Sequence, residues 1–237
     1  MKLSIIIPVF NEEKTVAKVI DRITNLKIPG VIKEIVIIDD GSKDSSGEIV
    51  RKRIKGTGIK FIKHEKNQGK GRAVRTGIKA STGDYIVIQD ADLEYNPKYI
   101  IDLVNEVKNK KAEVVYGSRL NRLPNLSKEE KSIQFLLHYF GNRFLSLFIS
   151  ILYMHWLTDM ETCYKLFPRK AVSGINLKAK GFELEPEITS KLLKKGYKIV
   201  EIPITATPRG YKEGKKLNTV KDGVKAFYSI IKYRFRN

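Results

Sequence analysis

The sequence predicts an α/β fold in which a mostly parallel, Rossmann-like central sheet carries helices on both faces. Short runs rich in β-branched residues alternate with segments of helical periodicity. Several of these runs are apolar throughout, which is typical of strands buried on both faces of a parallel sheet. The 237 residues, 42% of them hydrophobic, suffice for one sizeable core. We therefore expect a single domain over residues 1–237.

The first half of the chain alternates strand and helix signals. The first apolar run ends near Pro8, and Asn11 is expected to cap the helix that follows. The second run ends at Asp39, where Gly41 suits a turn. In chain order, we expect strand 2–9, helix 11–26, strand 34–38, helix 45–55, strand 59–62, helix 69–80, strand 85–89, helix 99–108 and strand 113–116.

The second half changes character and is expected to form an elaborated C-terminal part with amphipathic helices. Residues 129–156 are helical in pattern and very apolar over 144–157. That apolar stretch of about 14 residues is shorter than a membrane span requires, so a core helix and a helix at a membrane surface are both open. A further helix, a strand, a basic loop and an amphipathic helix are expected at 182–195, 198–204, 208–217 and 219–235.

The charge balance points to an anionic partner. The chain carries 45 Lys and Arg against 26 Asp and Glu, a formal net charge of +19. Phosphorylated substrates, an anionic membrane surface and nucleic acid are the candidates, and a merely Lys-rich surface is the alternative. No recognition helix or aromatic strand pair is evident, so a nucleic-acid-binding protein is disfavoured.

Cysteine usage and the N-terminus indicate the compartment. The single Cys163 excludes a disulfide framework and a cysteine metal cluster, and it favours a reducing compartment. The apolar run after Lys2 stops at Pro8 without a cleavage site, so no secretory signal is expected. We expect a cytoplasmic protein.

Two carboxylates, Asp90 and Asp92, follow the apolar run 85–88. Residues two apart on extended backbone project to the same side, and parallel sheets bind ligands at the carboxyl ends of their strands. Paired carboxylates suit a hard cation such as Mg²⁺ or Mn²⁺. The pattern predicts a metal–diphosphate site, with a solvated strand end as the alternative.

Polar and aromatic residues follow the first two strands. Phe10 could stack on a base, and Asn11 and Glu12 could bind polar edges. Asp40 could accept from a base N–H or a ribose hydroxyl, as acids at this place do in dinucleotide folds.

Basic residues offer phosphate contacts. Gly69 and Lys70 open a helix, and helix N-termini favour phosphate. Their segment matches neither the P-loop nor the dinucleotide fingerprint, which argues against an NTPase and against NAD binding. Planar arginine forks suit phosphate oxygens. The arginines and lysines that follow later elements include Arg119, Arg143, Arg209 and Lys215.

Taken together, the motifs resemble the family 2 glycosyltransferases of GT-A fold. The shared motifs are Pro8-Val9-Phe10-Asn11-Glu12, Asp39-Asp40-Gly41-Ser42, Asn67-Gln68-Gly69-Lys70-Gly71 and Asp90-Ala91-Asp92. The later motifs are similar to those of dolichyl-phosphate mannose synthases and polyprenyl-phosphate glucosyltransferases. They are Gly117-Ser118-Arg119, residues 158–167, and Glu213-Gly214-Lys215-Lys216 with Asp222-Gly223.

The resemblance implies roles for these residues. Nucleotide-sugar contacts would come from Pro8, Phe10, Asn11, Glu12, Ile38, Asp40, Gly69, Lys70, Asp90, Ala91 and Asp92. Asp90, Asp92 and Glu94 would hold the metal, and Asp90, Asp92 and Arg119 would be catalytic. The acceptor phosphate would be bound by Arg119, Arg143, Arg209 and Lys215.

The resemblance also implies an activity. We expect an inverting, metal-dependent enzyme that moves mannose or glucose from GDP-mannose or UDP-glucose to dolichyl or polyprenyl phosphate. Residues 1–120 would bind the donor, and 121–237 would bind the acceptor and the membrane surface. Relatives often carry membrane helices after this region. We therefore expect a peripheral protein on the cytoplasmic face, or one with a separate membrane-anchoring subunit. The alternative is a family member acting on a soluble or cell-envelope glycan.

Overall fold

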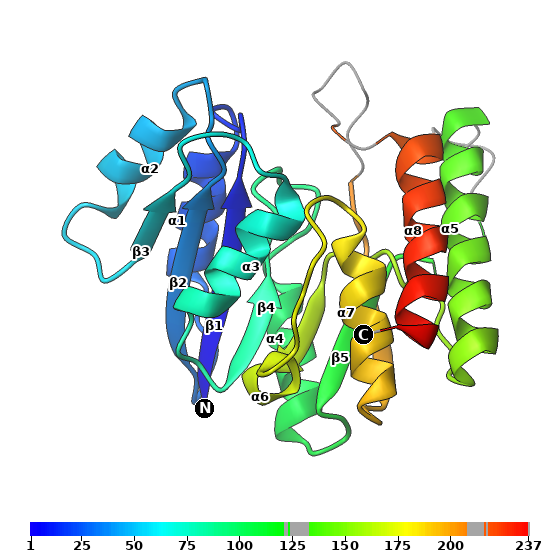
Figure 1. Ribbon diagram of the computed structural model, residues 1–237. Coiled ribbons are helices and arrows are strands. Elements are labelled where there is room, and N and C mark those ends of the chain that lie inside the picture. The colour runs from blue at the N-terminus through cyan, green and yellow to red at the C-terminus, as the bar shows by residue number, and fades with distance from the viewer. Residues whose placement is uncertain (121–122, 124–132, 208–215, 217, 237) are drawn as a thin grey trace.

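Both halves of the chain contribute strands to one seven-stranded sheet (Figure 1). The computed structural model describes residues 1–120, 123, 133–207, 216 and 218–236. The strands are β1 (Lys2–Val9), β2 (Ile32–Asp39), β3 (Lys60–Lys63), β4 (Tyr85–Ile88), β5 (Val114–Ser118), β6 (Lys165–Pro168) and β7 (Ile199–Pro203). The helices are α1 (Val16–Asn25), α2 (Ser46–Ile54), α3 (Lys70–Ala80), α4 (Tyr99–Lys108), α5 (Ile133–Tyr153), α6 (Arg169–Val172), α7 (Leu184–Lys194) and α8 (Thr219–Phe235).

The sheet is parallel except for β6. Its strand order is β3-β2-β1-β4-β6-β5-β7, and β6 runs antiparallel to both β4 and β5. Leu166 pairs with Val87 on one side and with Val115 on the other. This register places the carboxyl ends of β1, β2, β4 and β5 along one edge of the sheet. The sequence pattern did not predict β6.

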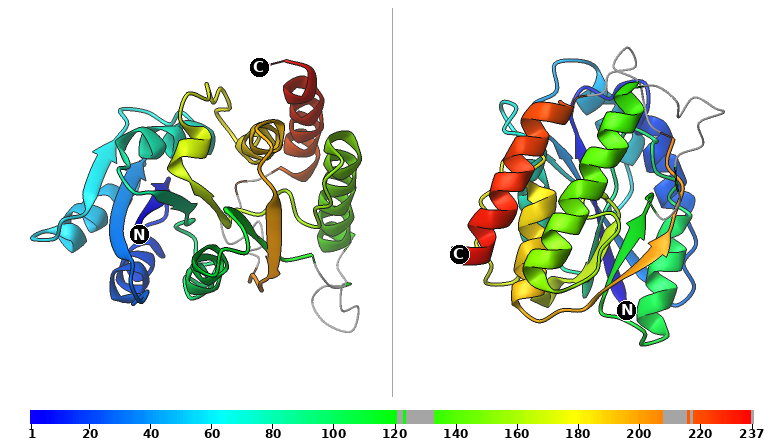
Figure 2. Two further views of the ribbon diagram at one scale, coloured as in Figure 1. Left: turned by 90° about the horizontal axis from the view of Figure 1, so that it is seen from below. Right: turned by 90° about the vertical axis from the view of Figure 1, so that its right-hand side faces the viewer.

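Alternating side chains of the strands form two cores. Ile6 of β1 packs with Val74 of α3 in one cluster, while Ile5 and Ile7 pack with α1 in the other. The first cluster also takes residues from α5, α7 and α8, and the second takes residues from α2 and α4. Figure 2 shows these two helical layers on either side of the sheet. The expected α/β fold with helices on both faces is confirmed.

Most helix bounds agree with the sequence pattern, but the first helix does not begin where expected. Helix α1 starts at Val16, with Thr15 at the N-cap position. Asn11 has a left-handed φ of 50°, and its side-chain oxygen accepts from the backbone N–H of Lys43. The prediction that Asn11 caps the first helix is therefore wrong, because its side chain bridges to the loop after β2.

Candidate active site

The loops after β1 and β2 are tied together by reciprocal hydrogen bonds. The Asn11 backbone N–H donates to Ser42 Oγ at 3.0 Å, and that of Glu13 donates to Asp44 Oδ2 at 3.1 Å. Glu13 returns a bond by accepting from the Ser45 backbone N–H at 3.1 Å. These contacts hold the predicted nucleotide-binding segments of both strands at one sheet edge.

Asp40 is the anchor of the loop that leads into α3. The side chain is buried and accepts from His64 Nδ1 at 2.6 Å and from Asn67 Nδ2 at 3.0 Å. Its carboxylate also accepts from the backbone N–H groups of Gln68 and Gly69, the latter at 2.8 Å. The anion that meets the start of α3 is thus an internal carboxylate, whereas we had expected a substrate phosphate at these amides.

Other residues predicted to line the nucleotide pocket fall into two groups. Ile38 is fully buried in the core beneath α3, so its side chain is unable to contact a ligand. Phe10 and Glu12 lie at the end of β1, where Lys216 reaches them from the C-terminal part. Its ammonium lies 2.7 Å from Glu12 Oε1 and 5.5 Å from the centre of the Phe10 ring. A basic side chain from a distant segment thus completes this end of the site.

Asp90 lies in a cluster of buried charges. Lys70, the first residue of α3, donates to Asp90 at 2.8 Å and to the Cys163 sulfur at 2.9 Å, and it lies 3.7 Å from Glu185. Burial alone would lower the pKa of Lys70, but Asp90 and the other neighbouring acidic groups outweigh it and raise that pKa well above its usual value. Glu185 also pairs with the fully buried Lys165 at 2.7 Å. Lys70 therefore stays a cation beside Asp90.

The segment after β4 is a turn, whereas the sequence argument assumed extended backbone. The strand ends at Ile88, Asp92 Oδ1 accepts from the Glu94 backbone N–H at 3.0 Å, and Leu93 between them has a φ of 66°. Burial raises the pKa of Tyr164, and both Asp90 and Asp92 raise it further, so both carboxylates lie near that phenol. Among the residues described here, no three acidic, histidine or cysteine side chains converge as metal ligands. The three-residue metal set that includes Glu94 stays a prediction.

Arg119 follows β5 and is held by a buried partner. Its Nε and Nη2 donate to the two carboxylate oxygens of Asp159 at 2.7 and 2.8 Å, and its backbone N–H donates to the same residue. Burial would lower the pKa of Arg119, but Asp159 raises it well above its usual value. The Arg119 side chain keeps 20% exposure, so the guanidinium is fixed yet reachable. Arg143 of α5 donates to the carbonyl of Leu120, which brings a second predicted arginine near this strand end.

Between these charge clusters lies Glu161, which the sequence reasoning did not assign. One oxygen of its carboxyl is buried, and burial raises the pKa of Glu161 to about 8. Asp159, Glu161 and Lys165 all belong to the motif 158–167, which the resemblance marked without giving roles to its charges. Arg209 and Lys215, predicted to bind phosphate, lie outside the described residues.

Helices α5 and α8 expose an apolar face. The exposed large side chains on them are Leu137, Phe140, Phe144, Leu147, Ile151, Met154, Val220, Val224, Tyr228 and Phe235, here called the apolar face. Phe227 of α8 packs against Phe144 and Phe148 of α5, which joins the two helices. By length and composition the stretch Phe135–Tyr153, 28% of it buried, could cross a membrane. The apolar helix is longer than expected, so length does not exclude a span.

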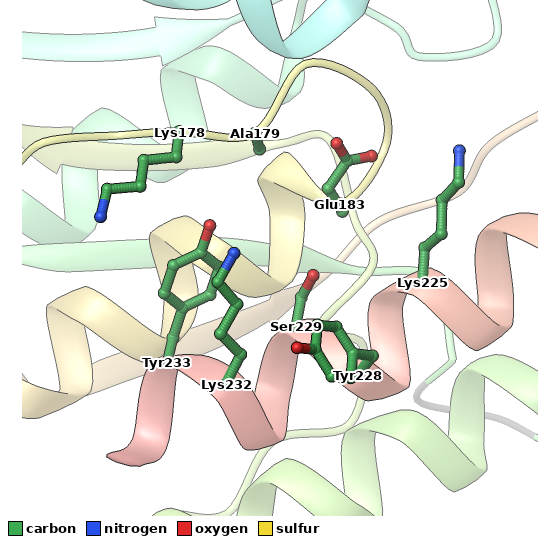
Figure 3. Close-up of a pocket in the computed structure, with 8 residues that line it drawn as sticks. All are labelled: Lys178, Ala179, Glu183, Lys225, Tyr228, Ser229, Lys232 and Tyr233. Carbon is green, nitrogen blue, oxygen red and sulfur yellow. The ribbon is translucent and has the colours of Figure 1, made fainter. Parts of the chain in front are cut away.

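A basic hollow adjoins this face. It has a volume of about 220 Å³ and is lined by Lys178, Ala179, Glu183, Lys225, Tyr228, Ser229, Lys232 and Tyr233 (Figure 3). Glu183 is the acid among these residues, and its carboxylate accepts from the backbone N–H groups of Lys180 and Gly181. The lysines therefore leave an excess of positive charge beside exposed apolar side chains.

Comparison with known proteins identifies the family. The model of the glycosyl transferase family 2 matches residues 4–175. The dolichol-phosphate mannosyltransferase of Pyrococcus furiosus is 30% identical, with 98% of this chain and 64% of that protein covered. The dolichyl-phosphate beta-glucosyltransferase of Dictyostelium discoideum is 28% identical, with 99% of this chain and 74% of that protein covered. This chain thus spans less than two thirds of the length of the Pyrococcus relative.

Solved structures show the same fold. Glucosyl-3-phosphoglycerate synthase from Mycobacterium tuberculosis, in complex with uridine diphosphate, has a TM-score of 0.71 at 17% identity, with 100% of this chain and 81% of that chain covered. The same enzyme with Mn²⁺, uridine diphosphate and glucosyl-3-phosphoglycerate has a TM-score of 0.70 at 18% identity, with the same coverage. The sheet with its edge of acids and arginines is the GT-A fold, and the chain belongs to the glycosyl transferase family 2.

Proposed function

We propose that this chain transfers a hexose, mannose or glucose, from a nucleotide sugar to dolichyl or polyprenyl phosphate with inversion at the sugar carbon. The observation that carries the proposal is the meeting of Asp90, Lys70 and Arg119 at one sheet edge of a protein that also exposes the apolar face. One substrate would be a soluble diphosphate and the other a lipid phosphate. The names of the curated relatives support this acceptor class.

At the donor end, Asp90 and Asp92 would hold Mg²⁺ or Mn²⁺. Two carboxylates fit the need, because Mg²⁺ is commonly bound by one or two carboxylates together with substrate phosphates and water. When bound, the cation would act as a Lewis acid that offsets charge on the departing nucleoside diphosphate. Lys70 keeps Asp90 ionised and adds a positive charge beside the diphosphate position.

At the acceptor end, Arg119 would bind the lipid phosphate in a fixed orientation set by Asp159. A phosphate oxygen is already an anionic nucleophile, so the reaction needs positioning and charge stabilisation more than a strong base. Arg143, Arg209 and Lys215 are proposed as further ligands of this phosphate. Two anionic substrates then meet between groups of positive charge.

The apolar face would hold the protein on the cytoplasmic surface of a membrane. A helix with exposed apolar residues flanked by lysines binds at the lipid interface, and the basic hollow would favour anionic lipids. A separate membrane-anchoring subunit is a further proposed partner. Either arrangement would bring the active site to the level of the lipid phosphate.

The test is transfer of labelled sugar into an organic-extractable lipid. GDP-mannose and UDP-glucose are offered separately with polyprenyl phosphate and Mg²⁺ or Mn²⁺. We expect lipid-soluble label from one donor, its loss with EDTA, and its loss in Asp92→Ala but not in the exposed control Asp102→Ala. Label found only in a water-soluble acceptor would instead favour a transferase of soluble or cell-envelope glycans.

A further inference from the structure

We propose that Glu161 is a specificity-determining residue whose carboxyl binds a hydroxyl of the donor hexose. This inference rests on the proposed function in so far as that function places a nucleotide sugar at this sheet edge.

The first observation is the position of Glu161 between the two charged ends of the site. Asp159, two residues before it, holds Arg119, and the sulfur of Cys163, two residues after it, accepts from Lys70. The side chains of Met160 and Thr162 are fully buried, and both of their carbonyls accept from the buried ammonium of Lys165. The backbone at Glu161 is therefore fixed, and its carboxyl lies between the proposed donor-phosphate and acceptor-phosphate positions.

The second observation is that this carboxyl has an unmet hydrogen-bonding need. Its Oε1 is buried without a partner, and among the described residues no hydrogen bond or ion pair to Glu161 is found. A buried polar atom without a partner costs about 1–3 kcal/mol of stability, so such atoms are usually matched by a ligand or water. Glu161 thus carries a cost that binding of a suitable group would remove.

The protonation state of the carboxyl narrows the chemistry of that group. Burial raises the pKa of Glu161 to about 8, Glu185 and Asp159 raise it too, and Lys165 and Arg119 oppose them. At neutral pH the carboxyl is therefore mostly neutral, with one O–H donor and an accepting oxygen. A hydroxyl group both accepts and donates, so it satisfies both, and a neutral carboxyl adds no repulsion towards the phosphates.

The substrates then decide which hydroxyl it is. The polyprenyl phosphate offers no alcohol, and the ribose belongs with the nucleotide near the ends of β1 and β2. The hexose is the part of the donor that bridges the diphosphate and the acceptor phosphate, which is where Glu161 lies. A sugar hydroxyl is accordingly the group that the geometry and the chemistry select.

The experiment compares binding of a nucleotide sugar with binding of its nucleoside diphosphate. Isothermal titration calorimetry with Mg²⁺ is run with UDP-glucose and UDP, and with GDP-mannose and GDP. The proteins are the wild type, Glu161→Leu, Glu161→Gln and the control Glu113→Gln, which removes an acid paired with Lys170 on the surface. For the donor of this enzyme, Glu161→Leu is expected to weaken nucleotide-sugar binding about tenfold and to leave nucleoside-diphosphate binding unchanged. Glu161→Gln keeps a donor and an acceptor and should bind like the wild type.

Monodeoxy donors supply a test that does not depend on a variant folding. In the wild type, one monodeoxy-hexose donor should bind about tenfold more weakly than the parent sugar, and in Glu161→Leu that penalty should disappear. Equal weakening of nucleotide sugar and nucleoside diphosphate in Glu161→Leu would overturn the inference, because it would indicate a structural role. Loss of turnover in Glu161→Gln with unchanged donor binding would also overturn it, in favour of a general base.

Failure of the acceptor assignment is separable from failure of this inference. If the sugar-dependent binding differences appear while no label enters polyprenyl phosphate, the proposed acceptor is wrong and the role of Glu161 is supported. If the wild type binds the nucleotide sugars no better than the nucleoside diphosphates, and no monodeoxy donor is penalised, the role of Glu161 is wrong even where lipid transfer is observed.

Discussion

Replacing Asp40 tests whether this carboxylate builds the site from within. Asp40 is 2% exposed and accepts from four donors, the side chains of His64 and Asn67 and the backbone N–H groups of Gln68 and Gly69. Asp40→Ala would leave all four without an acceptor in a partly buried loop. At about 1 kcal/mol for each unsatisfied donor, the expected loss is about 4 kcal/mol of the free energy of unfolding.

Asp40→Asn should cost much less, because the amide can be accommodated by a flip. If its nitrogen faces His64 Nδ1, that nitrogen accepts while Nε2–H donates to Thr76 Oγ1 at 3.0 Å. The remaining oxygen still accepts from the loop amides, so only the contribution of the negative charge is lost, about 2 kcal/mol.

The assay is urea unfolding followed by circular dichroism at pH 7. A matched control is Asp21→Ala, whose carboxylate pairs with Arg53 on the surface, both side chains being 41–50% exposed. Exposed pairs contribute little, so the control should unfold like the wild type. An Asp40→Ala protein within 1 kcal/mol of the wild type would refute the reasoning, as would equal losses in the alanine and asparagine variants.

Four further outcomes are expected. Gly71→Ala should lower stability by about 1–3 kcal/mol in urea unfolding, since a Cβ there would lie 2.8 Å from the Ala179 carbonyl, whereas Gly58→Ala, with open space around it, should not. Arg119→Lys should lose at least about tenfold in transfer rate, because an ammonium is unable to make the two-pronged contact with Asp159; an unchanged rate would remove Arg119 from the site. Ile151→Asp on the apolar face should reduce sedimentation with anionic vesicles and Ile32→Asp, equally 70% exposed on β2, should not; equal binding by both would contradict the membrane orientation. The folded-state pKa of Glu161, about 8, is raised above its usual 4.5, so between these values the unfolded chain binds fewer protons and stability falls as pH rises; Glu161→Gln should therefore gain stability over the wild type by up to about 1 kcal/mol per pH unit from 5.5 to 7.5, and parallel urea midpoints would contradict this.

The fold was largely predictable because periodicity reports burial. The continuous apolar runs of β1 and β2 and the spacing in α4 and α8 gave the right element types, and the bounds of the two helices agree with expectation. Strand β6 was missed because it has four residues and begins with Lys165, which reads as a solvent-exposed charge. Its burial depends on Glu185, twenty residues later, and a local pattern carries no information on such a partner.

The site was predictable in its residues more than in its contacts. Asp90, Lys70 and Arg119 follow strands or open a helix, and the topology brings them to one edge as expected. Their partners follow from tertiary structure: Lys70 meets Asp90 and Cys163, and Arg119 meets Asp159. For the same reason, the internal role of Asp40 and the orphaned oxygen of Glu161 had no signal in the spacing of the motifs.

The position of β6 has a consequence for biosynthesis. Strands β1 to β4 pair among themselves, but β5 pairs only with β6 and β7, and β6 forms the link between β4 and β5. A nascent chain that has not yet released residues 165–168 from the ribosome therefore exposes one edge of β4, and its β5 is without a neighbour. Uncovered strand edges invite association with other chains. The interval of synthesis between residues 88 and 168 is thus the period in which this enzyme depends most on protection from aggregation.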